Sequence, residues 1–222
     1  DEEGNIARYA TELIPPLEAL GRSFEVILVD DGSHDGTAAA AAALAKTDSR
    51  VRVVTLTPNR GLGGALRGGF AACGGEWVTT LDADLTFKPS AIRDLLAKAD
   101  AGADLVAGSP YLRKGDLADV SWARALPSLM LNALYRGIFG LALTSYTPVF
   151  RLYRASKLKK LTLTSQGFEI NAEIAARALM ARWQVAEVPA TLETRTSGVS
   201  KLRRWRELSR HARLIVRLLA GR

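Results

Sequence analysis

The chain has 222 residues, 48% of them hydrophobic, which is enough for one large domain with a proper core. Its single cysteine, Cys73, excludes an internal disulfide bond and suits a reducing compartment. The acidic opening at Asp1 predicts no signal peptide, and the longest apolar candidate, 125–143, is interrupted by a proline, an asparagine and an arginine, so no membrane-spanning segment is expected.

The net charge of +7 is divided unequally along the chain. Residues 1–110 hold 16 acidic and 10 basic side chains, hence −6, whereas residues 111–222 hold 7 and 20, hence +13. An acidic half can hold a metal ion, and a strongly basic half indicates a polyanionic partner such as phosphate, anionic lipid or nucleic acid. No nucleic-acid motif accompanies the basic residues, so we expect no nucleic-acid partner.

Strands and helices alternate through the first half. Residues 24–30 form a mostly continuous apolar run, typical of a strand buried on both faces of a parallel sheet. Further strands are predicted at 51–56, 77–81 and 105–108, and helices at 37–46, 61–72 and 90–101. This alternation predicts a parallel α/β sheet in which ligands bind beyond the carboxyl ends of the strands.

The pattern changes after Gly108. We predict a long apolar-rich helix at 122–143, a short strand at 147–153, a helix at 169–180, a strand at 185–194 and an amphipathic helix at 200–219. The last helix has an apolar face beside an arginine stripe: Leu202, Trp205, Leu208, Ala212, Ile215, Val216 and Leu219 against Arg203, Arg206, Arg210, Arg213 and Arg217. Such a helix suits an anionic membrane surface, and the alternative is a helix packed on its own domain with a solvated basic edge.

Two pairs of aspartates follow predicted strands. Asp82-Ala83-Asp84 ends one strand, and two carboxylates one residue apart suit a hard divalent cation that phosphate oxygens also hold. The alternative is that Asp84 caps the next turn while Asp82 is a solvated strand end. Asp30-Asp31 ends another strand, so both pairs can share one crevice at the carboxyl edge of the sheet.

A glycine-rich segment starts the helix predicted at 61–72. Asn59-Arg60-Gly61 would let phosphate approach the helix N-terminus closely, because glycine has no side chain and the first N–H groups favour an anion. The alternative is a tight turn and close helix packing through Gly63, Gly64, Gly68 and Gly69.

These motifs together resemble a known family. The stretches 29–37, 59–65 and 81–85 resemble family 2 glycosyltransferases of the GT-A fold. Phe150-Arg151, Gly167-Phe168-Glu169 and Arg195-x-x-Gly-x-Ser-Lys-Leu202 resemble the polyprenyl-phosphate glycosyltransferases, the dolichol-phosphate mannose synthase group. The resemblance implies a Rossmann-like, mostly parallel sheet flanked by helices, with 1–110 binding nucleotide sugar and metal and 111–222 binding the acceptor.

The resemblance also implies an activity and a place for it. A metal-dependent enzyme would transfer sugar, with inversion, from a GDP- or UDP-sugar to a polyprenyl or dolichyl phosphate. It would lie peripherally on the cytoplasmic face of the membrane, through the helix 200–219. A lipid monophosphate is largely dianionic at neutral pH, so its oxygen needs no general base. This fits a chain whose two histidines, His34 and His211, match no family catalytic position.

The family pattern assigns roles to particular residues. Mg²⁺ or Mn²⁺ would be held by Asp82 and Asp84, and Asp84 and Arg151 would be catalytic. Nucleotide-sugar contacts would come from Asp30, Asp31, Asn59, Gly61, Asp82 and Ala83. Acceptor-phosphate contacts would come from Arg113, Arg151, Arg195, Ser200 and Lys201. Glu169 and Glu173, four apart on one helix face, would orient the sugar or an arginine, and the alternative is a plain helix-surface role.

The chain departs from the family pattern at three places. The family opens with a strand carrying Pro-x-x-Asn-Glu, and this chain starts just after that motif, so we expect a sheet one strand short and a partly open nucleotide pocket. Thr86 stands where the family often has Gln, and Ser145 where many members have Asp. Two alternatives stay open: transfer to a polysaccharide hydroxyl, with Asp116 or Asp119 as base, and a non-catalytic, lipid-binding relative.

Overall fold

The computed structural model describes residues 1–113, 122–192 and 204–221, whose strands form two sheets. β1 (Val26–Asp30) and β2 (Val51–Thr55) pair in parallel. The second sheet has the order β3-β5-β4-β6, formed by β3 (Trp77–Thr80), β4 (Leu105–Ser109), β5 (Arg151–Arg154) and β6 (Val185–Pro189). β4 and β6 are parallel, whereas β5 runs antiparallel to both of its neighbours.

The insertion of β5 joins the two halves of the chain. This strand comes from the basic half and lies between two strands of the acidic half, with Thr80 opposite Arg151 and Ala107 opposite the same residue. β3, β4 and β6 therefore run in the same direction, as the mostly parallel pattern expected from the sequence requires, and β5 runs against them. The two halves share one sheet and are not separate structural units. The expected division of function at residue 110, between donor binding and acceptor binding, stays a prediction.

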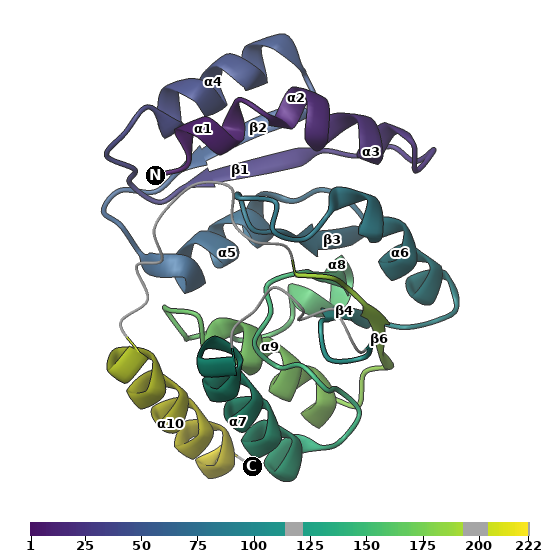
Figure 1. The fold of residues 1–222 in the computed structure, drawn as a ribbon, viewed down its shortest axis with the longest axis vertical. Helices are drawn as coiled ribbons and strands as arrows, with labels where there is room; N and C mark the ends of the chain where they lie inside the picture. The colour runs from purple at the N-terminus through teal and green to yellow at the C-terminus, as the bar shows by residue number, and fades with distance from the viewer. Residues whose placement is uncertain (114–121, 193–203, 222) are drawn as a thin grey trace.

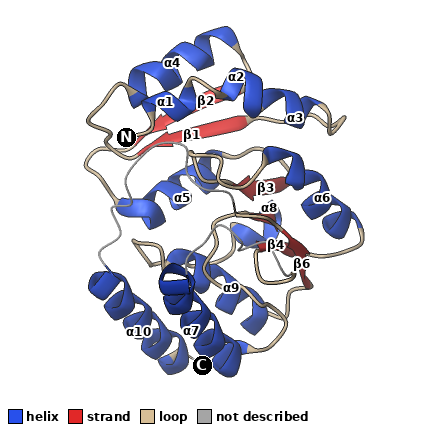
Figure 2. Ribbon diagram, in the orientation of Figure 1, coloured by secondary structure: helices blue, strands red, loops and turns tan. Residues whose placement is uncertain are grey.

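Helices cover both faces of the strands (Figures 1 and 2). The N-terminal ones are α1 (Glu3–Ile6), α2 (Tyr9–Glu12), α3 (Ile14–Glu18), α4 (Thr37–Thr47) and α5 (Gly61–Ala72). The 3-10 turn η1 (Pro89–Ala91) leads into α6 (Ile92–Asp100). The remaining helices are α7 (Trp122–Phe139), α8 (Ala155–Leu158), α9 (Ile170–Met180) and α10 (Arg204–Ala220).

Predicted and observed elements agree in the first half and differ more in the second. α5 has the predicted bounds, and α4 differs from its prediction by one residue. The strand predicted from 147 begins at Arg151, and the strand predicted to 194 ends at Pro189. α7 ends at Phe139 because Gly140 adopts φ +129°, a conformation that stops a helix. The short helices before β1 and α8 were not predicted.

The core lies on both faces of the larger sheet. Leu105 and Ala107 of β4 and Tyr153 of β5 pack on one side, with α7, α9 and α10. Val106 and Leu152 point to the other side, toward α2 and α6. This alternation follows the two-residue period of a strand, so each face of β4 and β5 contributes to a separate cluster.

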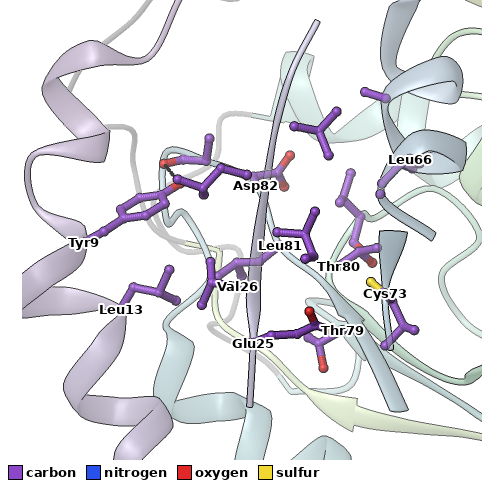
Figure 3. A pocket seen from close by; sticks show the side chains of 18 of the residues that line it. Tyr9, Leu13, Glu25, Val26, Leu66, Cys73, Thr79, Thr80, Leu81 and Asp82 are labelled. Atoms are coloured by element: carbon purple, nitrogen blue, oxygen red, sulfur yellow. Dashed lines mark hydrogen bonds between the residues drawn. The ribbon is translucent and has the colours of Figure 1, made fainter. Parts of the chain in front are cut away.

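A cavity separates the two sheets. Within the described residues, β1 and β3 belong to different sheets, and a space of about 1120 Å³ lies between them. Its walls come from both strands, the N-terminal helices and α5, and include Leu13, Val26, Leu66 and Leu81 (Figure 3). Within the described residues, β1 and β3 therefore do not pair with each other across this cavity.

Candidate active site

Asp82, Ala83 and Asp84 form a tight turn at the carboxyl end of β3. The N–H of Leu85 donates to the carbonyl of Asp82 at 3.0 Å, and Leu85 has φ +54°, which is uncommon for a residue with a side chain. The hydroxyl of Tyr9 donates to the carbonyl of Ala83 at 2.9 Å (Figure 3). Backbone strain of this kind is often kept at functional sites, because the surrounding structure must hold it in place.

The carboxylate of Asp84 is nearly buried and is oriented by Thr86. Its Oδ1 accepts from the Thr86 N–H at 3.1 Å and from the Thr86 hydroxyl at 2.9 Å. Asp84 therefore caps the turn, which is the alternative role that the sequence analysis gave for this residue. A carboxylate has two oxygens and about four lone-pair positions, so capping and metal binding are compatible. Thr86, which replaces the family's Gln, serves here to position Asp84.

The crevice beside this turn has a negative potential. Burial raises the pKa of Tyr9, and the neighbouring carboxylates of Glu2, Asp84 and Asp82 raise it further. A phenolate is disfavoured where negative charge is already concentrated, and a cation is favoured there for the same reason. The potential therefore favours a cation, although the described residues include no cluster of three or more His, Cys, Asp or Glu side chains placed to hold a metal ion.

The structure brings the second aspartate pair to the same cavity. Asp30, Asp31, Asn59, Asp82 and Ala83 all line it. The Oδ1 of Asp30 accepts from the Ser33 N–H at 2.9 Å. Asp84 does not line this cavity, so the structure brings three of the four aspartates to the predicted crevice, and the roles of these residues stay predictions.

A second set of bonds links the loop after β1 to the loop after β2. The Oδ1 of Asp31 accepts from the Arg60 N–H at 2.7 Å, and the Asn59 side chain donates to the Asp31 carbonyl at 2.5 Å. Asp31 and Asn59 thus hold each other's loops while both face the cavity.

Gly61 is placed by close packing. It adopts φ +71°, and a Cβ at this position would lie 2.5 Å from the carbonyl oxygen of Gln166. Its N–H donates to Asn59 Oδ1 at 3.1 Å, and the N–H of Gly63 donates to Gln166 at 2.8 Å. The close-packing alternative accounts for these glycines, and a phosphate contact by Gly61 stays a prediction.

Arg151 lies in the interior and does not line the cavity. Its side chain is 0% exposed and donates to the carbonyls of Asn171 and Ser145. In this position the guanidinium ties β5 to α9 and to the loop before β5. Its assignment to the acceptor phosphate stays a prediction, and such contact requires the loop at Ser145 to move.

The other predicted acceptor residues are dispersed or undescribed. Arg113 is exposed after β4. Arg195, Ser200 and Lys201 lie outside the described residues, as do Asp116 and Asp119. Of the two histidines, His34 is exposed beside the cavity and His211 is buried against α7.

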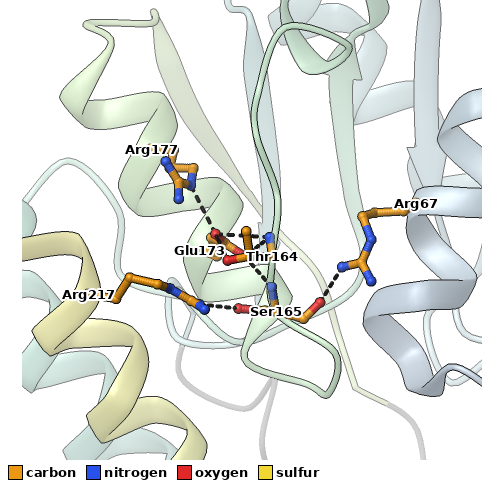
Figure 4. Close-up of polar contacts among 6 residues, drawn as sticks. All are labelled: Arg67, Thr164, Ser165, Glu173, Arg177 and Arg217. Carbon is orange, nitrogen blue, oxygen red and sulfur yellow. Dashed lines mark hydrogen bonds and ion pairs between the residues drawn. The ribbon is translucent and has the colours of Figure 1, made fainter. Parts of the chain in front are cut away.

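The segment 164–166 was not identified from the sequence as part of this region, although the motif that follows it, from Gly167, was. Glu173 of α9 is fully buried and accepts from the N–H groups of Thr164 and Ser165 and from Nε of Arg177 (Figure 4). Although burial alone would raise the pKa of Glu173, these N–H groups and Arg177 hold it below its ordinary value. The prediction that Glu173 orients an arginine is confirmed.

Two arginines reach the same loop from other helices. Arg67 of α5 donates to the Ser165 carbonyl, and Arg217 of α10 donates to the Ser165 hydroxyl at 3.2 Å (Figure 4). Ser165 therefore connects α5, α9 and α10 beneath the N-terminus of α5. No periodicity marks a contact between residues so distant in the chain, so only the structure could find it.

The fold and the crevice together define an α/β protein that presents paired carboxylates at the carboxyl edge of its strands. Residues 10–162 match Glycosyl transferase family 2, and the chain belongs to this family.

Curated relatives are similar over much of the chain. It is 36% identical over 184 residues to the polyprenol monophosphomannose synthase of Mycolicibacterium smegmatis, which covers 80% of this chain and 69% of that protein. It is 33% identical over 160 residues to an undecaprenyl-phosphate 4-deoxy-4-formamido-L-arabinose transferase of Shewanella sediminis, covering 72% of this chain and 47% of that one. The chain thus spans only about half the length of the latter relative.

Solved structures show the same fold. Glucosyl-3-phosphoglycerate synthase of Mycobacterium tuberculosis superposes with a TM-score of 0.68 at 22% identity, covering 100% of this chain and 76% of that one. The same enzyme in complex with Mn²⁺ and UDP-glucose superposes with a TM-score of 0.65 at 23% identity. The predicted GT-A type of α/β fold is confirmed.

Proposed function

We propose that this protein transfers a sugar, with inversion, from a nucleotide-sugar donor to a polyprenyl phosphate at the cytoplasmic face of a membrane. The observation that carries the proposal is the shared crevice, in which Asp82 and Ala83 face Asp30 and Asp31 across one cavity. The names of the mannose synthase and the arabinose transferase support a lipid phosphate as acceptor.

The donor diphosphate would lie against the turn after β3. Asp82 and Asp84 would hold a divalent cation, Mg²⁺ or Mn²⁺, which when bound neutralises the diphosphate leaving group as a Lewis acid. Thr86 keeps the Asp84 carboxylate in one orientation through two hydrogen bonds. A cation also relieves the negative potential that raises the pKa of Tyr9.

The nucleoside would lie between the two sheets. Asp30 and Asp31 can accept hydrogen bonds from ribose hydroxyls or a base N–H, since each carboxylate has more lone pairs than its one backbone contact uses. Asn59 faces the same cavity and holds the Asp31 loop in place.

The acceptor would be positioned by basic residues of the second half. A phosphate monoester attacks without a general base, so the protein has to orient its oxygen in line with the leaving group and screen its charge. Arg113, Arg195, Ser200 and Lys201 are the candidates for direct contact. Arg151 donates to the carbonyl of Ser145, so it would position the loop before β5. It would contact the acceptor phosphate directly only if that loop opened.

The test is a screen of GDP- and UDP-linked sugars against a short, water-soluble prenyl phosphate, with Mg²⁺ and with Mn²⁺. We expect a prenyl-phosphate sugar with inverted anomeric configuration for at least one donor, and no product after chelation. Transfer only to saccharide hydroxyls would contradict the acceptor assignment. Lack of both transfer and metal-dependent donor hydrolysis would support a non-catalytic, lipid-binding relative instead.

A further inference from the structure

Two carboxylates at the start of α9 hold the backbone N–H groups of the loop 164–167. Glu173 accepts from the first two N–H groups at 3.1 and 2.8 Å. Glu169, one helical turn earlier, accepts from the last two, both at 3.2 Å. Glu169 is 5% and Glu173 0% exposed, so water does not compete for these bonds. The two side chains therefore fix the position of a whole backbone segment.

The carbonyl groups of the same loop bond to α5. The Ser165 carbonyl accepts from Arg67, and the Gln166 carbonyl accepts from the Gly63 N–H at 2.8 Å (Figure 4). A Cβ on Gly61 would lie 2.5 Å from the Gln166 carbonyl oxygen, so the loop and the helix N-terminus are in close contact. The loop is thus held between α9 and α5, and its position determines that of the N-terminus of α5.

The contacts continue to the loops that line the cavity. The N–H of Gly61 donates to Asn59 Oδ1 at 3.1 Å, and the Asn59 side chain donates to the Asp31 carbonyl at 2.5 Å. The carboxylate of Asp31 accepts from the Arg60 N–H at 2.7 Å. Asn59 and Asp31 both line the cavity. A continuous series of hydrogen bonds and close contacts therefore connects the buried carboxylates of α9 with the cavity wall.

Helix α10 also contacts this loop. Arg217 donates to the Ser165 hydroxyl at 3.2 Å, and the helix packs on the protein through buried His211, Leu214 and Leu218. Leu208 and Val216 of the predicted apolar face are exposed, so the alternative of a helix packed on its own domain is correct for the buried face. A membrane contact by the exposed face stays a prediction, and no helix in the described ranges is long and apolar enough to cross a bilayer.

The charge of Glu173 indicates more than a packing contact. A buried carboxylate costs free energy unless several donors stabilise it, whereas an apolar contact would join the helices without that cost. Although burial raises it, the N–H groups of the loop and Arg177 hold the pKa of Glu173 below its ordinary value. An ionised carboxylate that accepts two adjacent N–H groups restricts a loop to one position, because these bonds are short and directional.

We infer that Glu173, together with Glu169, is a positioning residue for the nucleotide donor. The carboxylates hold the loop 164–167, and the loop keeps the N-terminus of α5 and the segments of Asn59 and Asp31 in the arrangement that binds nucleotide. Neither carboxylate lines the cavity, so both act through the backbone between them and the nucleotide. The inference rests on the proposed function in one respect: the donor nucleotide binds beside Asp31.

The test compares Glu173→Gln with the parent by calorimetry, with GDP and with UDP in the presence of Mn²⁺. Glutamine keeps the shape of the side chain, but its NH₂ group would oppose an N–H group of the loop. Nucleotide affinity should fall by about tenfold, because a less ordered pocket loses more freedom on binding. In the transfer assay the donor KM should rise by the same factor, while kcat and the KM of the soluble acceptor stay within about twofold.

Hydrogen exchange supplies a readout that needs no nucleotide. The backbone amides of 59–65 should exchange faster in Glu173→Gln than in the parent, because the loop that holds this segment is released. The amides of α6, which lies away from this loop, should exchange alike in both proteins (Figure 1).

The matched control is Asp104→Asn. Asp104 is also 5% exposed, and it accepts from the Gln184 N–H at 2.9 Å and from Lys157 at 2.6 Å, but it does not line the cavity. This variant should lose stability and still bind nucleotide like the parent. An equal loss of nucleotide affinity in both variants would mean general destabilisation and would overturn the inference.

A second variant covers the case in which Glu173→Gln does not fold. Arg67→Gln removes one bond between α5 and the loop and leaves both carboxylates in place, so nucleotide affinity should fall by about threefold. Unchanged affinity in the folded variant would overturn the inference, as would a parent that binds neither nucleotide. Weaker nucleotide binding by a variant of a protein that transfers no sugar would support the inference and refute the proposed transfer. Transfer with an unchanged donor KM would do the reverse.

Discussion

Asp84 shows how much of the site is determined by neighbouring residues. The pair Asp82 and Asp84 was recognisable because both carboxylates and the strand before them are contiguous in sequence. The strained turn at Leu85 and the two hydrogen bonds from Thr86 also involve neighbouring residues, but the sequence did not predict their geometry. Tyr9, which holds the Ala83 carbonyl from 74 residues away, had no sequence signal.

We predict that Asp84→Ala lowers sugar transfer by about 10²-fold or more while the protein stays folded. The lost carboxylate would otherwise hold the metal on the donor diphosphate, and its two hydrogen bonds with Thr86 are local to the turn after β3. Turnover of the purified variant, with circular dichroism to confirm folding, is the measurement.

The matched control is Asp35→Ala. Asp35 is exposed and accepts from the N–H and the hydroxyl of Thr37, so it serves the turn before α4. Turnover by this variant should stay near that of the parent. Near-normal turnover by Asp84→Ala would mean that the metal assignment is wrong.

His211 predicts a pH dependence of stability. Burial lowers the pKa of His211 to about 4, although Glu169 opposes the shift. The unfolded chain gains a proton near pH 6.5 and the folded one does not, so stability present above that pH is lost as pH falls toward 4. The loss from this group should be roughly 2–3 kcal/mol.

The measurement is the free energy of unfolding in urea between pH 7 and pH 4. Depressed carboxyl groups such as Glu173 act in the same direction. The comparison with His211→Gln isolates the histidine, because the variant should show a shallower decline. Parallel curves for the two proteins would exclude a neutral buried histidine.

At the scale of elements, the loop 164–167 and the N-terminus of α5 form one packed unit. Ser165 is held from three helices by Arg67, Glu173 and Arg217 (Figure 4). Because this loop lies directly on Gly61 and Gly63, the glycines allow the backbones to approach closely. The sequence left phosphate binding and close packing as equal alternatives. The tertiary contact shows the close packing at Gly61 and Gly63, and the phosphate contact stays a prediction.

We predict that Gly63→Ala destabilises the protein by about 1–3 kcal/mol. Its Cβ would lie 2.2 Å from the Ser165 carbonyl oxygen, so the loop must shift. Gly68→Ala in the same helix is the control, since its Cβ would meet only the Leu56 side chain at 3.4 Å. It should be neutral or slightly stabilising, because alanine favours helix. Thermal unfolding of both variants tests the contrast, and equal melting temperatures would refute the packing argument.

At the scale of the whole molecule, the cavity between β1 and β3 is the place where we propose that the nucleotide binds. The strands that would supply its backbone walls are paired only on their far sides within the described part of the chain. Asp1 lies at the carboxyl edge of the cavity and accepts from the His34 N–H at 2.8 Å.

We predict that this chain by itself binds nucleotide weakly, because its pocket is partly open. Extension before Asp1 by an apolar, strand-forming segment should strengthen binding by about tenfold or more, since a preorganised pocket loses less freedom on binding. Calorimetry with GDP and UDP is the measurement, and a glycine- and proline-rich extension of equal length is the control. Tight binding by the unextended chain would contradict the prediction.

The sequence by itself predicted most of the longer elements and the carboxylate pairs at the strand ends, because hydrophobic periodicity and contiguous motifs are local properties. The bounds of α5 and the sharing of one crevice by Asp30 and Asp82 followed from such local patterns. Only the tertiary structure decided that β5 inserts antiparallel between β3 and β4, that Arg151 is buried, and that α10 packs through His211 rather than its apolar stripe. These outcomes depend on which surfaces of the chain pack together. That packing and hydrogen bonding involves residues far apart in the chain, so no single segment encodes it.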